Sequence, residues 1–181
     1  MKAILSFLWE IVKIVVVAMA IVVPVRYFLF QPFLVRGQSM EPNFENGDYL
    51  IIDEISYRMR PPQRGEVIVF NYPQNPSQRF IKRIIGLPGE KVEVREGRVF
   101  VYKDGREITL DESGYLPQSA QTPGSVDLQL GSGEYFVMGD NRTFSLDSRS
   151  WGTLPEKEII GRVYLRILPF VAFAKIEVPA Y

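Results

Sequence analysis

Residues 91–107 read KVEVREGRVFVYKDGRE, and their pattern indicates the architecture of most of the chain. Valines occupy every second position at 92 and 94 and again at 99 and 101. This is the period of a β-strand with one buried face. A glycine turn separates the two runs and another follows the second run, as is typical of β-hairpins. The region is therefore predicted to form β-hairpins.

Similar short apolar runs, rich in Val, Ile, Phe and Tyr and bounded by turn residues, continue on both sides and also predict strands. They are DYLIID (48–53), EVIVFNY (66–72), RFIKRIIG (79–86), EYFVMGD (134–140) and GRVYLRILPF (161–170). No stretch after residue 31 shows sustained helical periodicity. Residues 31–181 are thus predicted to form a mainly β domain, in which the Ser-, Pro-, Gly- and Gln-rich residues 111–133 form a loop-like insertion.

The N-terminus has a different composition. Residues 7–33, FLWEIVKIVVVAMAIVVPVRYFLFQPF, are apolar apart from Glu10, Lys13 and Arg26. The longest uncharged run, residues 14–25, is shorter than the roughly 20 residues that a membrane-spanning helix needs. Pairing of Glu10 with Lys13 on one helical face, and an Arg26 side chain extended towards the headgroups, would lengthen the apolar span to about residues 9–30.

Three interpretations of this segment stay open: a retained membrane anchor, a cleaved secretory signal and a buried core helix. Ala18-Met19-Ala20 matches the A-x-A cleavage site of a secretory signal. The apolar sequence IVVPV continues directly past that site, however, where a signal's apolar core should have ended. We therefore expect residues 1–30 to hold a short cytoplasmic start and one transmembrane helix, with residues 31–181 on the extracytoplasmic side of the cell membrane.

The composition excludes several classes of function. Lysine plus arginine equals aspartate plus glutamate at 21 each, so no basic excess predicts binding to nucleic acid. The chain contains no cysteine and no histidine, which excludes Ser-His-Asp and Cys-His mechanisms and removes the commonest metal ligands. Asp53, Asp140 and Asp147 lack the spacing of a hard-cation loop. We expect neither a metal nor another cofactor.

Two residues could combine in a serine mechanism without histidine. Ser39 follows a glycine turn in RGQSMEPNF (36–44), although a serine near Gly and Pro is more often a turn or cap residue. Lysine is the remaining base able to activate a serine near neutral pH. On a strand, Lys82 shares a face with Phe80 and Ile84, where desolvation would lower its pKa. From its position alone, an edge-strand lysine that extends to water is the simpler interpretation.

The order of motifs along the chain carries more information than any one of them. An apolar N-terminal segment is followed by SMEPNF (39–44), GDYLIID (47–53), KRIIGLPGE (82–90) and GDNRTFSLDSR (139–149). This series resembles type I signal peptidases, the membrane-anchored serine proteases that remove signal peptides from exported proteins, and it covers essentially the whole chain. The resemblance implies a signal-peptidase-type antiparallel β catalytic domain whose partners are preprotein signal peptides and the lipid bilayer.

The resemblance also implies a Ser-Lys dyad that works through an acyl-enzyme. Ser39 matches the family's nucleophile, Lys82 its general base, and Ser145 the hydroxyl that orients the lysine amine. The other matched positions are the ion pairs Arg83–Asp140 and Asp147–Arg149, and the lining of two shallow apolar pockets that would give an A-x-A preference: Phe33, Val35, Met40, Leu50, Phe80 and Ile81.

Two positions depart from the family's pattern. Gly37 stands where some members carry a serine that donates a hydrogen bond to the oxyanion, so that donor is missing or is a backbone N–H. Arg36 stands where many relatives have a proline, at the rim of the implied pockets.

Two alternatives to this function remain. Another Ser-Lys protease of related fold, such as a self-cleaving repressor, would need a helical DNA-binding domain that the apolar N-terminus does not offer. In the other alternative, the chain is a catalytically inactive, membrane-anchored β-domain in which Ser39 and Lys82 are structural. A cleavage assay with Ser39→Ala and Lys82→Ala separates these hypotheses.

Overall fold

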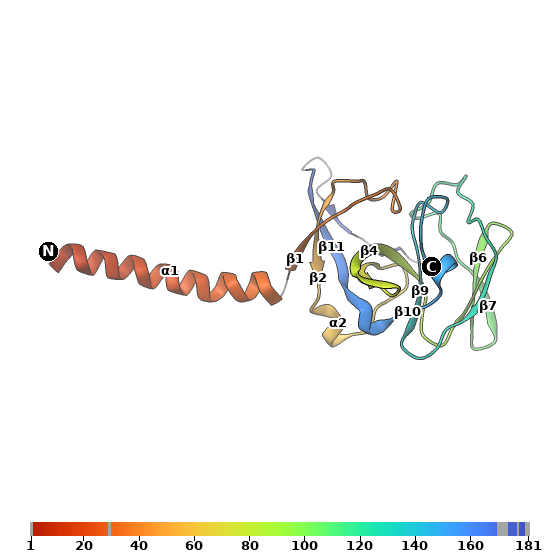
Figure 1. The fold of residues 1–181 in the computed structure, drawn as a ribbon, viewed down its shortest axis with the longest axis horizontal. Coiled ribbons are helices and arrows are strands. Elements are labelled where there is room, and N and C mark those ends of the chain that lie inside the picture. The colour runs from red at the N-terminus through yellow and green to blue at the C-terminus, as the bar shows by residue number, and fades with distance from the viewer. Residues whose placement is uncertain (1, 29, 170–173, 177, 180–181) are drawn as a thin grey trace.

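The computed structural model describes residues 2–28, 30–169, 174–176, 178 and 179. Helix α1 (Lys2–Phe28) projects away from a β-rich body (Figure 1). Large apolar side chains on this helix, including Ile4, Phe7 and Trp9, are exposed. Across the described part of the chain, no helix combines the length and the hydropathy that a bilayer crossing requires. The predicted transmembrane helix is therefore not found in the structure.

Two antiparallel sheets form the body. The first has eight strands in the order β1-β2-β11-β3-β4-β9-β10, with β12 beside β11, and the second has the order β7-β6-β5-β8. The strands are β1 (Phe30–Leu34), β2 (Tyr49–Asp53), β3 (Val67–Tyr72), β4 (Asn75–Gly86), β5 (Lys91–Arg95), β6 (Arg98–Lys103), β7 (Arg106–Thr109), β8 (Val126–Gln129), β9 (Glu134–Met138), β10 (Leu154–Pro155), β11 (Ile159–Leu168) and β12 (Ala174–Lys175). Every run predicted as a strand forms one, and the prediction of a mainly antiparallel β fold is confirmed.

The predicted hairpins lie in the second sheet. Strands β5 and β6 pair across the REGR turn, so that Val92 faces Val101 and Val94 faces Val99. All four valines are fully buried, which explains their strict alternation. The turn needs a left-handed backbone, with φ of 52° at Glu96 and 74° at Gly97.

The segment 111–133 is more ordered than a loop. It contains β8, which pairs with β5 through Val94–Val126 and Val92–Leu128. The segment also buries Tyr115, Leu116 and Leu130. The sequence signal for β8 is weak because only two half-buried apolar side chains alternate over four residues. Among the described residues beyond α1, helix is confined to single turns: α2 (Ser56–Met59), α3 (Ser148–Trp151) and η1 (Glu156–Glu158).

Strand β4 links the two sheets and runs from solvent into the interior. Its residues 75–79 are exposed and those from Ile81 onwards are buried. At its inner end, a Cβ on Gly86 would lie 2.4 Å from a methyl group of Val92 and 3.0 Å from Cβ of Phe136. The two sheets therefore pack in direct contact at Gly86, and β4 holds a fixed position between β3 and β9.

Candidate active site

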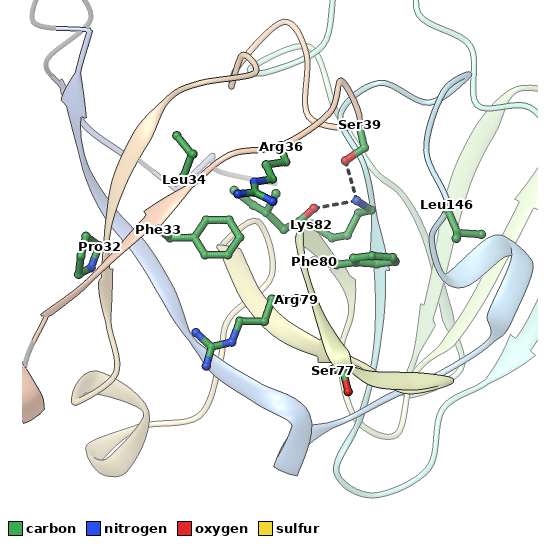
Figure 2. Close-up of a pocket in the computed structure, with 11 residues that line it drawn as sticks. Pro32, Phe33, Leu34, Arg36, Ser39, Ser77, Arg79, Phe80, Lys82 and Leu146 are labelled. Atoms are coloured by element: carbon green, nitrogen blue, oxygen red, sulfur yellow. Dashed lines mark hydrogen bonds between the residues drawn. The ribbon is translucent and has the colours of Figure 1, made fainter.

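The side chains of Ser39 and Lys82 contact each other. Lys82 Nζ lies 2.7 Å from Ser39 Oγ and 2.8 Å from the Ile81 carbonyl oxygen, to which it donates (Figure 2). Ser39 belongs to the turn that follows β1, and Lys82 belongs to β4, 43 residues further along the chain. The fold thus brings a hydroxyl and an amine within hydrogen-bonding distance.

The Lys82 side chain does not extend to water, because the residue is only 3% exposed. The solvated edge-strand interpretation is therefore wrong. Burial disfavours the ammonium form and lowers the pKa of Lys82 to about 8, although the negative charges of Asp147 and Asp140 oppose this effect. The amine also lies 5.3 Å from the centre of the Phe80 ring. Lys82 is consequently a base that loses its proton much more readily than an exposed lysine.

The loop of residues 139–147 packs tightly against Ser39. The Asn141 N–H donates to the Ser39 carbonyl at 3.1 Å. A Cβ at Gly139 would lie 2.3 Å from that carbonyl oxygen and 2.3 Å from Ser145 Oγ, so no side chain fits there. The buried Ser145 Oγ makes no hydrogen bond of normal geometry among the described residues, although it lies near enough to Asp147 to help lower the pKa of that carboxyl. Glycine at position 139 therefore allows the Ser145 side chain and the Ser39 backbone to lie close together.

Buried ion pairs hold this loop. Arg83 binds Asp140 through two hydrogen bonds, of 2.8 Å from Nε and 2.7 Å from an Nη. Arg149 binds Asp147 with the same bidentate geometry, at 2.8 Å for each contact. Burial raises the pKa of Asp147, but Arg149 and the Gly139 N–H outweigh it, so the pKa is lowered overall. The lowered pKa favours the carboxylate form of Asp147, whose charge acts on the Lys82 amine.

A third buried cation, Arg142, belongs to the same support and has no counterpart among the predicted site residues. Its guanidinium donates to Glu112 at 2.8 Å, to Thr122, and at 3.1 Å to the Tyr115 hydroxyl. It also donates to the Gly139 carbonyl at 3.1 Å. The segment 112–122 is therefore tied to the loop that carries Ser145. The density of polar residues in GDNRTFSLDSR indicates a hydrogen-bonded loop. It does not identify Glu112 as the partner of Arg142, because the two residues are 30 positions apart.

A groove of about 510 Å³ opens in front of Ser39 and Lys82. Of the predicted pocket residues, Phe33, Phe80 and Ile81 line it. Val35, Met40 and Leu50 do not line this groove and lie instead in a buried core cluster with Ile52, Val67 and Val163. Their assignment to the pockets followed from the family resemblance, which does not distinguish a pocket wall from the core beneath it. The other lining residues are Pro32, Leu34, Arg36, Ser77, Arg79 and Leu146.

The backbone around Ser39 offers one donor to an oxyanion. The Gly37 N–H already donates to Asn46 Oδ1 at 2.9 Å. Gly37 has φ of +88°, and a Cβ there would meet nothing within 4 Å. Among the hydrogen bonds of the described residues, none uses the Ser39 N–H. The structure thus leaves Ser39 N–H, rather than Gly37 N–H, as the available donor.

Acidic side chains near the site are engaged by arginines and not grouped around a common centre. No cluster of three or more metal-ligating residues occurs in the described ranges.

The comparisons with known proteins agree on one family. A family model described as signal peptidase, peptidase S26, matches residues 8–168. The chain is 38% identical over 171 residues to a probable signal peptidase I-1 of Synechocystis, covering 91% of this chain and 84% of that protein. It is 34% identical over 170 residues to signal peptidase I of Bacillus caldolyticus, covering 87% and 90%. A crystal structure of a signal peptidase I from Enterococcus faecalis aligns with a TM-score of 0.47 and 31% identity, covering 57% of this chain and 97% of that one.

Proposed function

Since the chain belongs to the signal peptidase family described as peptidase S26, we propose that it cleaves signal peptides from exported preproteins with a Ser39–Lys82 dyad. Membership makes it a hydrolase, a serine endopeptidase of the signal peptidase I class. The observation that carries the proposed mechanism is the 2.7 Å contact between Lys82 Nζ and Ser39 Oγ, with Lys82 almost fully buried.

The first half of the proposed reaction acylates Ser39. The neutral amine of Lys82 accepts the Ser39 proton as Oγ attacks the scissile carbonyl carbon. The resulting tetrahedral intermediate collapses when the C–N bond breaks, and Lys82 passes the proton to the departing amine. The mature protein leaves with a new N-terminus, and the signal peptide stays attached to Ser39 as an ester.

The second half releases the signal peptide. Lys82, again neutral, removes a proton from a water molecule that attacks the ester carbonyl. The C–Oγ bond then breaks, and the proton returns to Ser39. The lowered pKa of Lys82, about 8, supports this role because an appreciable fraction of the amine is neutral near physiological pH.

Ser145 is proposed as a positioning residue for the lysine. Its buried hydroxyl makes no hydrogen bond of normal geometry within the described structure and lies near Asp147, whose charge also acts on the Lys82 amine. A buried hydroxyl normally forms a hydrogen bond, and a small rotation of the Lys82 amine during proton transfer would provide one. If so, Ser145→Ala alters the pH profile of cleavage as well as its rate, whereas a purely structural serine would leave the pH profile unchanged.

The Ser39 backbone N–H is proposed as one donor of the oxyanion hole. One such donor typically contributes about 10²–10³ in rate. The Gly37 N–H already donates to Asn46 Oδ1. We therefore propose that the second donor of the oxyanion hole differs from the serine hydroxyl that some family members carry at the position of Gly37.

We also propose that residues 1–30 attach the enzyme to the cell membrane and that residues 31–181 form the extracytoplasmic catalytic domain. The support is the long helix α1, which projects away from the body (Figure 1) and whose large apolar side chains are exposed. Exposed apolar surface of this extent indicates contact with lipid or another partner. Flotation of the full chain with lipid vesicles tests the attachment, and Val16→Asp should reduce the floating fraction.

The cleavage assay uses the full chain in detergent and a preprotein with an A-x-A site. Ser39→Ala and Lys82→Ala should each abolish cleavage, whereas the matched exposed controls Ser119→Ala and Lys157→Ala should retain it. Cleavage at the wild-type rate by either dyad variant would contradict the mechanism. Absence of cleavage by the wild type would favour an inactive β-domain.

A further inference from the structure

The groove in front of Ser39 carries an unbalanced positive charge. Arg36 and Arg79 both line it, and no aspartate or glutamate does. Both arginines are exposed, and neither forms an ion pair among the described residues. Since the whole chain has a formal net charge of +0, this charge is a local property of the groove.

One carboxylate lies near enough to reduce the charge. Burial raises the pKa of Glu54, and the charges of Arg79 and Arg58 oppose that rise. Glu54 thus offsets part of the charge of Arg79, whereas Arg36 forms no ion pair among the described residues. A peptide carboxylate placed in the groove would meet a net positive potential.

The two arginines mark one side of the cleavage point. In Figure 2, Arg36 and Arg79 lie on the same side of Ser39 as Phe33, whereas Leu146 lies on the opposite side. The apolar lining residues Phe33, Phe80 and Ile81 are candidates for holding the small side chains of an A-x-A sequence. The arginines therefore lie beside Phe33, a candidate for holding the part of the substrate that precedes the cut.

Alternation in an extended peptide indicates which substrate residues would meet the arginines. Side chains of a strand point to opposite faces in turn. If the first and third residues before the cut enter the apolar lining, the second and fourth face the exposed rim. We infer that Arg36 and Arg79 make the enzyme prefer an acidic side chain at the second or fourth residue before the cut, an inference that rests on the proposed function.

The expected size of the preference follows from the exposure of both arginines. Ion pairs at exposed sites correspond to about 1.5- to 5-fold for each pair. They weaken as salt screens the charges over about 10 Å at 0.1 M. The preference should therefore be modest and should decline with increasing ionic strength.

The test measures kcat/KM for the full chain in a neutral detergent. The peptides share one A-x-A site and carry Glu, Gln or Lys at the second or the fourth position before the cut. For the wild type, the Glu/Gln ratio should be about 2–10 at low salt and approach 1 at high salt. In Arg36→Glu and Arg79→Glu, the ratio should fall below 1, and the Lys peptide should become the better substrate.

The matched control is Arg98→Glu, an exposed arginine on β6 of the other sheet, which should keep the wild-type ratio. A ratio near 1 in the wild type, or one that neither charge reversal changes, overturns the inference while leaving the proposed function intact. If the reversals change only the dependence of activity on added anionic lipid, the arginines bind headgroups and the inference is wrong. Failure of the wild type to cut the Gln peptide contradicts the proposed function and this inference together.

Discussion

Lys82 and Arg83 are adjacent on β4 and equally buried, at 3% exposure each, yet their surroundings differ in kind. Arg83 belongs to a shell of ion pairs around the site, together with Arg149 and Arg142, and each of these guanidiniums meets a carboxylate. Lys82 lies at the centre and contacts a hydroxyl, a carbonyl and an aromatic ring. The arginine shell neutralises its buried charges with carboxylates. The Lys82 amine has no ion-pair partner among the described residues, so its charged form bears the cost of desolvation.

The difference separates stability from reactivity. A buried ion pair fixes two side chains, and removal of one partner leaves a costly uncompensated charge. An amine buried without a counter-ion is destabilised in its charged form, so it becomes a base near neutral pH. The rigid shell keeps the unpaired amine from moving towards water or towards an acid. Each prediction below changes one side of this comparison.

Lys82→Met should produce the largest effect and should separate activity from stability. Loss of the proposed general base should lower kcat/KM by about 10²–10⁴-fold. The same substitution should raise the free energy of unfolding at pH 7 by roughly 1–3 kcal/mol, because methionine avoids the cost of protonating an amine whose pKa is about 8 instead of 10.5. Peptide cleavage and urea unfolding in detergent measure the two quantities.

The matched control for this variant is Lys157→Met, an exposed lysine in η1, which should change neither quantity. A Lys82→Met enzyme that is less stable than the wild type by more than about 1 kcal/mol would contradict the contrast between centre and shell.

Arg83→Met should have the opposite profile, with a large loss of stability. Asp140 would stay buried without its cation, which typically costs about 3–5 kcal/mol. Arg95→Met is the comparison variant, since Arg95 pairs with Glu107 at the surface and should cost less than about 1 kcal/mol. Addition of Asp140→Asn to Arg83→Met should recover part of the loss. No recovery would mean that packing, and not charge, explains the effect.

Gly139→Ala should separate the Ser39 turn from the loop that carries Ser145. The added methyl group would lie 2.3 Å from the Ser39 carbonyl oxygen and from Ser145 Oγ. Overpacking of this kind costs roughly 1–3 kcal/mol, and a displacement near 1 Å at the site lowers kcat/KM by about 10²-fold. Gly114→Ala is the control, because its Cβ would meet only Pro179 at 3.8 Å. Wild-type cleavage by Gly139→Ala would show that the approach of the two segments is not required.

A change of one pH unit should have the smallest effect, a change of at most about tenfold in kcat/KM. The proposed mechanism needs neutral Lys82, so kcat/KM should rise with pH and level off above a midpoint near 8. The shell should not titrate there, because the pKa of Asp147 is lowered and that of Arg142 is raised. The stability that Asp147 contributes is present above its unfolded pKa and is lost only as pH falls through its lower folded pKa.

Circular dichroism at each pH provides the control for that profile. The fold should persist at pH 6, where activity has fallen. Full activity at pH 5 would exclude Lys82 as the neutral base.

Patterns with strong alternation identified most of both sheets, whereas β1, β8, β10 and β12 were missed; β1 and β10 show the physical reasons. β1 follows the apolar N-terminus directly and contains a proline, so its residues 30–34 have no boundary in the sequence. β10 has only two residues, Leu154 and Pro155, too few for any period. In both cases pairing with a neighbouring strand, and not local sequence, creates the element.

The site could be predicted only in part. A lysine between apolar residues indicates a lowered pKa, but local sequence does not fix the partner of Lys82. The distance between Lys82 and Ser39 depends on the register of β4 against β3, where Lys82 faces Ile68. The same limit applies to Glu112, whose contact with Arg142 spans 30 residues. Contacts between distant segments follow from the assembled sheet and carry no local signal.

The length of β4 has a consequence for how the enzyme tolerates insertions and deletions. This one strand carries three parts of the site in sequence. They are the groove rim at Ser77 and Arg79, the apolar wall at Phe80 and Ile81, and the pair Lys82 and Arg83. A single residue inserted or deleted between Arg79 and Lys82 would exchange the inward and outward faces of the groove rim relative to those of Lys82 and Arg83. Homologous enzymes should therefore conserve the spacing between the β3–β4 turn and Arg83.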